Sequence, residues 1–192
     1  MGARMIIVAA PSGAGKSSFV ERLTSEMSVL ADTVTYTTRS MRDGESEGHP
    51  YHFVSREKFL ELARDGFFVE WAEVHKNLYG TPLHQIEAAW KVGRVVIMDV
   101  DIQGAATFKS KYTQDAASIF ILPPSIEELR RRVMKRDGGK TKDIELRMEN
   151  AAREIAAAPH FDHRVVNDDF ETSYNEFKKL VQKLIESGGS EL

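Results

Sequence analysis

The chain contains 192 residues, of which 42% are hydrophobic and 29% are charged, and its formal net charge at pH 7 is −3. This composition is typical of a globular domain and excludes a mainly disordered chain, while the net charge argues against a general affinity for nucleic acid or an anionic membrane. No apolar run approaches the roughly 20 residues that cross a bilayer, and the amino-terminal residues lack the longer apolar core of a signal peptide, so we expect a cytoplasmic location. Cysteine is absent, which excludes disulfides and thiolate metal sites.

The first predicted element is a buried strand over the short apolar run Met5–Ala9. A glycine-rich turn follows, and Phe19, Leu23 and Met27 then recur at helical spacing. The beginning of the chain therefore predicts a strand, a loop and a helix in succession.

The stretch from about Val34 to Gln85 has a different pattern. Three alternating or aromatic strand-like runs, TVTYTT, YHFV and FFVEWAEV, surround one short helix that begins after Ser55. We interpret this stretch as a mixed insertion rather than another unit of strand and helix. Thr81 as a cap and Pro82 at the first helical position predict a return to helix before Gly93.

Two further apolar runs have the length of strands, Val95–Met98 and Ser118–Leu122. Each is followed by polar or helical sequence, as parallel α/β units require. Ser125 and Glu128 form a capping box that starts a helix, and the helix is expected to end near residues 137–139. A parallel sheet is therefore the expected centre of the fold.

The rest of the chain predicts two helices and an edge strand. Asp143 can cap the first helix and Pro159 stops it. The apolar stripe of this helix consists of Ile144, Met148, Ala152 and Ile155. Arg164–Val166 predicts the edge strand. The last helix is amphipathic and places on one face Tyr174, Phe177, Leu180, Val181, Leu184 and Ile185.

The sequence APSGAGKS, Ala10–Ser17, lies between the first strand and the first helix, where a phosphate-binding P-loop must lie. Its N–H groups can wrap a phosphate, Lys16 can reach the β- and γ-phosphates of ATP, and the Ser17 hydroxyl can ligate Mg²⁺. Ala10 stands in place of the usual first glycine, and an ordinary glycine-rich turn is the alternative. Asp99, at the carboxyl end of a predicted strand, can hold Mg²⁺ through water or can be a simple turn residue.

The insertion begins with TTRSMRDGE, residues Thr37–Glu45, which contain two arginines in a polar setting. The planar guanidinium groups of Arg39 and Arg42 suit a phosphate dianion. The alternative is a surface salt bridge from these arginines to Asp43 or Glu45.

Three more side chains of the insertion can bind a polar ligand. Tyr51 and Tyr79 offer phenolic donors, and Glu70 is a carboxylate in the apolar run FVEWAEV. A buried carboxylate needs partners, although the alternation of this run can also turn Glu70 to solvent.

These motifs, in this order and at these separations, resemble the guanylate kinase family. They are PSGAGKSS, TTRSMRDGE, Tyr51-His52-Phe53, EWAEVHKNLYGT and DVDIQGA, and the resemblance runs from about residue 4 to residue 186. It implies a single α/β domain, residues 1–192, with a P-loop NTPase-like parallel sheet core flanked by helices. The core is expected at 1–34, 86–132 and 148–192, with a mixed α+β GMP-binding subdomain at 35–85 and a short lid at about 133–147.

The resemblance also implies a GMP site. Its residues are expected to be Thr35, Arg39, Arg42, Glu45, Tyr51, Glu70, Tyr79, Gly80, Thr81 and Asp101. Guanine offers an N1–H and an exocyclic amine, which a carboxylate accepts, and an O6 atom, to which a hydroxyl can donate. A buried polar site of this kind rejects adenine, because its own groups are left unpaired.

The ATP site implied by the resemblance includes the P-loop and residues far from it in sequence: Ala10, Pro11, Ser12, Gly13, Ala14, Gly15, Lys16, Ser17, Ser18, Arg132, Arg136 and Asn167. The catalytic residues are expected to be Lys16, Arg39, Arg132, Arg136 and Arg147. Mg²⁺ is expected at Ser17 and Asp99, partly through water. Asn167 matches a family position near the adenine, whereas the aspartates after it can instead cap a helix.

The expected reaction is Mg-dependent, in-line transfer of the terminal phosphoryl group of ATP to GMP or dGMP, giving ADP and GDP in purine nucleotide metabolism and GMP recycling. One alternative is a non-catalytic binding module related to guanylate kinase, which the intact Gly15-Lys16-Ser17 argues against. The other is a related P-loop kinase with a different acceptor, and Glu70 and Asp101 favour GMP over it. No nucleic acid or membrane partner is expected, and the sequence identifies no protein partner.

Overall fold

The strand β1 (Met5–Ala9) lies at the centre of the computed structural model, which describes residues 2–42, 44–74, 76–136 and 143–186. All of its side chains are buried because helices cover both faces of its sheet. Ile6 and Val8 belong to the core on one face, and Met5, Ile7 and Ala9 belong to the core on the other. The predicted buried strand is confirmed.

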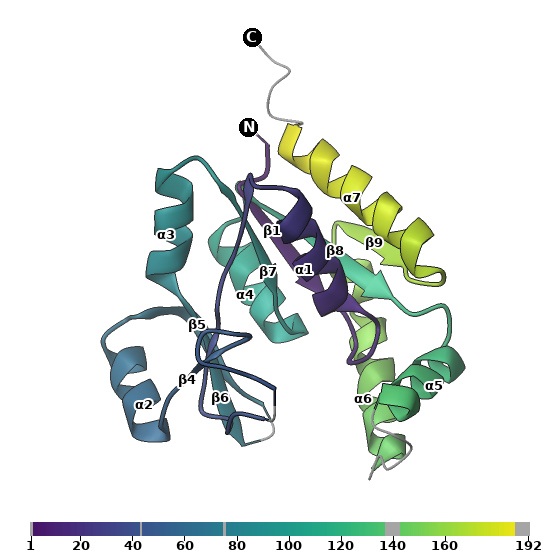
Figure 1. Ribbon diagram of the computed structural model, residues 1–192, viewed down its shortest axis with the longest axis horizontal. Coiled ribbons are helices and arrows are strands. Elements are labelled where there is room, and N and C mark those ends of the chain that lie inside the picture. The colour runs from purple at the N-terminus through teal and green to yellow at the C-terminus, as the bar shows by residue number, and fades with distance from the viewer. Residues whose placement is uncertain (1, 43, 75, 137–142, 187–192) are drawn as a thin grey trace.

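Five parallel strands form the larger sheet, in the order β2, β7, β1, β8, β9 (Figure 1). The other four are β2 (Leu30–Asp32), β7 (Val95–Asp99), β8 (Ala116–Leu122) and β9 (His163–Val166). The three later strands confirm the predicted apolar runs and the edge strand. The strand β2 was not predicted, because three residues are too short to show a period.

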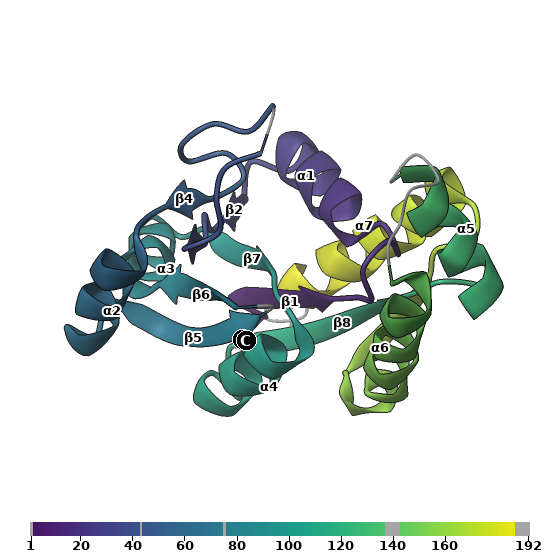
Figure 2. The same cartoon turned by 90° about the horizontal axis from the view of Figure 1, so that it is seen from below.

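Helices cover the two faces of this sheet in pairs. Helices α1 (Lys16–Glu26) and α7 (Phe170–Glu186) pack on one face, and α3 (Leu83–Lys91) and α4 (Ile102–Lys111) pack on the other. Figure 2 shows α1 and α7 on the side of the sheet opposite α4. Burial of a large apolar side chain contributes about 1.5–3 kcal/mol, so both layers stabilise the sheet. None of the helices in the described ranges has the length and apolar character that a membrane span requires.

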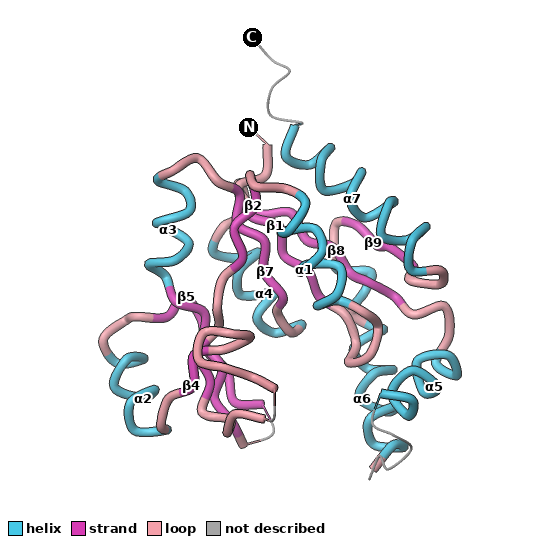
Figure 3. Tube along the Cα trace, in the orientation of Figure 1, coloured by secondary structure: helices cyan, strands magenta, loops and turns pink. Residues whose placement is uncertain are grey.

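The smaller sheet is mixed and has the strand order β4, β3, β6, β5. Its strands are β3 (Tyr36–Thr37), β4 (His52–Phe53), β5 (Phe68–Val74) and β6 (Asn77–Pro82). Helix α2 (Arg56–Arg64) packs beside it, and most of the chain between β3 and β4 is loop (Figure 3). This confirms the mixed insertion, including the helix after Ser55, whose hydroxyl accepts a hydrogen bond from the Lys58 N–H at 3.2 Å.

Helices α5 (Ile126–Arg136) and α6 (Ile144–Ala156) stand beside the P-loop, and a short 3₁₀ turn, η1 (Ala158–His160), follows α6. The Ser125 hydroxyl accepts a hydrogen bond from the Glu128 N–H at 3.1 Å, as the predicted cap requires. The Glu128 carboxylate instead binds Arg131 and Arg132, so the capping box is not reciprocal. The turn predicted at 137–139 lies outside the described residues.

Three local predictions are wrong. Thr81 does not cap α3, because it lies within β6 and Pro82 takes the N-cap position. In α6 Ala152 is exposed, and Ala151 is buried with Met148 against α5. Asp143 precedes α6 with a left-handed backbone φ of 63° and makes no side-chain cap hydrogen bond.

Candidate active site

The predicted P-loop joins β1 to α1 through two glycines in left-handed conformations. Gly13 and Gly15 have φ angles of 95° and 96°, which favour glycine because other residues rarely adopt them. A Cβ atom would lie 2.7 Å from a Val133 methyl at Gly13 and 2.5 Å from the Asn167 amide nitrogen at Gly15. The loop thus leads into the amino terminus of α1, where unpaired N–H groups favour an anion.

The Asp99 carboxylate contacts two P-loop residues, Lys16, which is predicted to bind phosphate, and Ser17, which is predicted to bind Mg²⁺. The Ser17 hydroxyl donates to Asp99 Oδ2 at 2.7 Å, and Lys16 forms an ion pair with Asp99 Oδ1. Lys16 Nζ also donates to the carbonyl oxygen of Val100 at 2.8 Å. Ser17 and Asp99 therefore bring together a hydroxyl and a carboxylate, the oxygen donors that Mg²⁺ prefers, so these residues fit the metal. The role of Val100 was missed, because a backbone acceptor leaves no signal in the residue type.

A cavity of about 230 Å³ brings the P-loop lysine together with most of the predicted GMP-binding residues. Its lining consists of Lys16, Thr35, Tyr51, Glu70, Ala72, Tyr79, Thr81, Asp99, Val100, Asp101 and Gly104. The walls come from the carboxyl end of the larger sheet and from the smaller sheet, so side chains distant in sequence meet here.

Glu70 is directed into this cavity by the pairing of β5 with β6. The register shifts between Phe68 and Glu70, and Glu70 then faces Thr81, whose hydroxyl donates to Glu70 Oε1 at 3.1 Å. Burial raises the pKa of Glu70 to about 7; the Thr81 hydrogen bond opposes this shift, and the charge of Asp101 adds to it. The alternative that alternation turns Glu70 to solvent is therefore wrong.

Asp101 lines the cavity and also caps α4. Its Oδ1 atom accepts a hydrogen bond from the Gly104 N–H at 2.7 Å. A Cβ atom at position 104 would lie 3.3 Å from Asp101 Oδ1 and 3.7 Å from Glu70 Oε2. Gly104 therefore leaves space beside both carboxylates. An aspartate shortly after the predicted strand Val95–Met98 was the available signal for this cap.

Arg39 lies over the aromatic rings of Tyr51 and Phe53. Its Nη2 atom pairs with Glu45 Oε1 at 2.7 Å, and its Nη1 atom donates to the Ser40 carbonyl at 2.8 Å. Its guanidinium carbon lies 5.4 Å from the centre of the Tyr51 ring, which is 5.8 Å from that of Tyr79. The predicted alternative of a salt bridge to Glu45 is therefore present. It lowers the pKa of Glu45 and raises that of Arg39.

A second hollow, of about 960 Å³, lies between the insertion and helices α5 and α6. Of the predicted site residues it is lined by Ser12, Arg42, Asp101, Arg136 and Arg147. Arg42 thus shares a hollow with two of the predicted lid arginines, while Asp101 lines both hollows.

Several predicted site residues line neither hollow, among them Arg132, Asn167 and Gly80. Arg132 binds Glu128 Oε1 at 2.8 Å and the carbonyl oxygens of Asn167 and Asp168 at 2.9 and 3.1 Å. The Asn167 amide donates to the Ala14 carbonyl. Gly80 lies in β6 over the aromatic cluster of the smaller sheet, where a Cβ atom would meet two phenylalanine rings at 2.9 Å.

Comparison with known proteins gives a consistent result. A sequence model of the family described as Guanylate kinase matches residues 2–184. The chain is 60% identical over 185 residues to the guanylate kinase of Bdellovibrio bacteriovorus, covering 96% of this chain and 100% of that protein. It is 40% identical to the guanylate kinase of Rubrobacter xylanophilus, covering 96% of each chain.

Solved structures show the same relationship. The crystal structure of guanylate kinase from Anaplasma phagocytophilum matches with a TM-score of 0.80 and 32% identity, over 96% of this chain and 87% of that one. Shikimate kinase from Bacteroides thetaiotaomicron matches with a TM-score of 0.50 and 14% identity, over 93% and 98% of the two chains. The second match concerns the fold alone.

Proposed function

The chain belongs to the guanylate kinase family, and we propose that its two hollows hold GMP and ATP for transfer of the terminal phosphoryl group of ATP to GMP, giving ADP and GDP. One observation carries this proposal: the same cavity is lined by the P-loop lysine, Lys16, and by the paired Glu70 and Thr81. A group that binds phosphate and a group that can recognise guanine therefore lie in one space.

Glu70 reads the guanine base in this proposal. Its ionised carboxylate accepts hydrogen bonds from the N1–H and the exocyclic amine, and the Thr81 hydroxyl fixes its position. Thr35 and Asp101, which line the same cavity, complete the contacts to the base. Adenine presents an unprotonated N1 to Glu70 and leaves the carboxylate unpaired, which disfavours AMP.

Arg39, Arg42, Tyr51 and Tyr79 bind the phosphate of GMP in this proposal. Arg39 is held in place by Glu45, and its guanidinium group lies over the Tyr51 ring, which in turn contacts the Tyr79 ring. Arg42 joins from the second hollow when the two sides approach. Planar guanidinium groups can bind a phosphate through two hydrogen bonds each, which fixes the acceptor oxygen.

The P-loop residues from Ala10 to Ser18 hold the phosphates of ATP, and Lys16 contacts the transferring group. Lys16 is bound to Asp99 and Val100, so nucleotide binding requires exchange of these contacts. Arg136 and Arg147 supply positive charge from the second hollow. Arg132 can join them only after it releases its present partners, Glu128 and the backbone after β9.

Ser17 and Asp99 would hold Mg²⁺, partly through water. The bound metal would supply positive charge to the phosphate oxygens. The acceptor is already an anionic phosphate oxygen, so positioning and electrostatics provide the catalysis and no dedicated base is needed.

Residues 35–85 act as the GMP-binding subdomain in this proposal, and residues 133–147 act as the lid, of which 137–142 lie outside the described residues. The remaining residues form the core. In this proposal the GMP-binding subdomain approaches the P-loop and helices α5 and α6, which excludes water from the transferring phosphoryl group. The reaction serves purine nucleotide metabolism and GMP recycling, and we place it in the cytoplasm with GMP or dGMP and ATP as the small-molecule substrates.

A phosphorylation assay across GMP, dGMP, AMP, UMP and ribose phosphates tests the proposed function. We expect turnover of GMP and dGMP, with kcat/KM for AMP lower by at least about a hundredfold. Lys16→Ala should remain folded and lose nearly all activity. Comparable kcat/KM for AMP and GMP would contradict the base recognition, and wild-type turnover by Lys16→Ala would contradict the P-loop assignment.

A further inference from the structure

Asn167 is a buried polar residue that contacts the P-loop from outside the nucleotide hollows. Its side chain and backbone are only 4% exposed, and it lies between β9 and α7. Its amide nitrogen donates to the carbonyl oxygen of Ala14 at 2.7 Å, and its backbone N–H donates to the carbonyl oxygen of Leu122 at 2.8 Å. The second bond anchors Asn167 to the end of β8, so the first fixes the P-loop to the larger sheet.

The hydrogen bond at Ala14 determines the direction of the next N–H group. In a planar trans peptide the C=O and N–H groups point in opposite directions. A carbonyl of Ala14 held toward Asn167 therefore turns the N–H of Gly15 away from Asn167. Because the Gly15 backbone is left-handed and lacks a side chain, this peptide can rotate more freely than others. The hydrogen bond from the Asn167 amide therefore restrains the orientation of the Ala14–Gly15 peptide.

Two further contacts link helix α5 to this region, one at Ala14 and one at Asn167. The Ala14 side chain is fully buried in a cluster with Leu129 and Val133 of α5. Arg132 of the same helix donates to the backbone carbonyl of Asn167 at 2.9 Å. The P-loop, Asn167 and α5 are therefore connected in a closed ring of contacts.

We infer that Asn167 is a positioning residue, which holds the Ala14–Gly15 peptide so that the Gly15 N–H faces the phosphates of ATP. It acts through the P-loop and needs no contact with the adenine base. This differs from the expectation of a nucleotide-contacting residue near adenine. The inference rests on the proposed function, because it takes the P-loop as the ATP phosphate site.

A phosphate ligand without a base separates the two roles. Equilibrium binding of ATP and of inorganic tripolyphosphate, each with Mg²⁺, is measured for the wild type and for Asn167→Ala. Loss of one hydrogen bond should weaken the binding of both ligands by a similar factor, about two- to tenfold. The KM for ATP should rise by the same factor, while the KM for GMP stays the same. Val166→Thr, an exposed and nearly isosteric change at the preceding position, serves as the control and should bind both ligands like the wild type.

Weaker binding of ATP with unchanged binding of tripolyphosphate would overturn the inference, because Asn167 would then act on the base. Unchanged binding of both ligands would overturn it as well. Should Asn167→Ala be too unstable to assay, Asn167→Leu keeps a similar shape and removes the amide donor without adding a charge, and the same pattern is required of it. The GMP kinase activity of the wild type tests the proposed function separately, since that activity stands whichever result the variants give.

Discussion

The Thr81 hydroxyl donates to Glu70 across paired strands at 3.1 Å, and among the residues that the structure describes it is the one hydrogen-bond partner of this buried carboxylate. The remaining acceptor capacity of Glu70 faces the cavity and suits the two N–H donors of guanine.

Glu70→Gln should lower kcat/KM for GMP by about ten- to a hundredfold, because the amide presents a donor where guanine also presents one. The much slower reaction with AMP should not decrease. Steady-state kinetics with both nucleotides provides the measurement. Glu61→Gln, on exposed α2, is the matched control and should keep wild-type values. Equal losses for GMP and AMP would show that Glu70 has a structural role instead.

The pKa of Glu70, about 7, predicts a pH dependence of GMP binding. Guanine requires the ionised carboxylate, so affinity should fall by up to about tenfold per pH unit below 7. The phosphate of GMP itself titrates near 6, so the same titration with Glu70→Gln is needed as the reference. Any pH dependence of GMP affinity that the wild type shows and the variant lacks is due to the titration of Glu70. Identical profiles of the two proteins between pH 6 and 8 would contradict this assignment.

The same pKa fixes the sign of an effect on stability. The pKa of Glu70 is raised in the folded state from 4.5, so folding favours the protonated form. The cost to stability is absent below about 4.5, grows as the pH rises, and is complete above about 7. The buried carboxylate that recognises guanine therefore makes the folded protein less stable at neutral and alkaline pH.

The sequence predicted the parts of the fold that depend on local pattern. Buried parallel strands such as β1 and β8 are continuous apolar runs, so their sequences identify them. The strand β6 was missed because NLYGTP contains the residues of a turn, and only pairing with β3 and β5 makes it a strand. The same pairing explains the error at Thr81, which stands before a proline like a helix cap but donates to Glu70 instead.

In the site, too, the parts that are continuous in sequence were predictable and the contacts between distant segments were not. The P-loop is continuous in sequence, so its motif alone identified it. The backbone partners of Arg132 were not predictable, because Asn167 and Asp168 lie on a segment that only the folded sheet brings near α5. The contact of Asn167 with Ala14 depends on the same tertiary arrangement.

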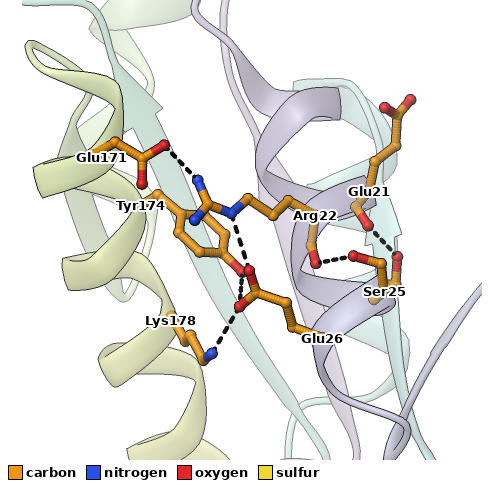
Figure 4. A network of polar contacts seen from close by, with 8 residues as sticks. Glu21, Arg22, Ser25, Glu26, Glu171, Tyr174 and Lys178 are labelled. Atoms are coloured by element: carbon orange, nitrogen blue, oxygen red, sulfur yellow. Dashed lines mark hydrogen bonds and ion pairs between the residues drawn. The ribbon is translucent and has the colours of Figure 1, made fainter.

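A network on the outer side of the larger sheet joins α1 to α7 and predicts a pH-dependent stability (Figure 4). Glu26 accepts hydrogen bonds from the Tyr174 hydroxyl and Lys178 at 2.7 Å each, and from Arg22 at 3.0 Å. These bonds, that of Lys178 first, lower the pKa of Glu26 from 4.5 to about 2. Its contribution to stability is therefore complete above about 4.5 and is lost as the pH falls through about 2.

Glu26→Gln should lower the Tm at pH 7, and the difference from the wild type should shrink below pH 4.5. Thermal unfolding at pH 7 and pH 4 measures both effects. Glu21→Gln is the control, because Glu21 lies on the same helix with its side chain directed away from the network (Figure 4). A Tm difference that grows on acidification would contradict the assigned sign.

The last prediction separates two of the arginines that line the second hollow, one from the insertion and one from α5. Arg42 belongs to the insertion, and Arg136 is the last residue of α5. In the proposed mechanism Arg42 binds the phosphate of GMP before the reaction, whereas Arg136 meets the charge that develops on the transferring phosphoryl group. An arginine that stabilises this developing charge can raise the rate by about 10³–10⁵-fold. Where several arginines stabilise the same charge, the effect of removing any one of them is smaller.

Arg136→Ala should therefore lower kcat by at least about tenfold with little change in GMP affinity. Arg42→Ala should weaken GMP binding markedly, because the contact of Arg42 with the GMP phosphate already exists in the ground state. Equilibrium GMP binding and steady-state kinetics on both variants measure the two effects. Lys135→Ala removes a neighbouring positive charge of α5 that lines neither hollow and should behave like the wild type. An unchanged kcat in Arg136→Ala would show that Arg136 does not stabilise the transferring phosphoryl group. A loss of GMP affinity equal to that of Arg42→Ala would show that Arg136 binds the acceptor phosphate instead.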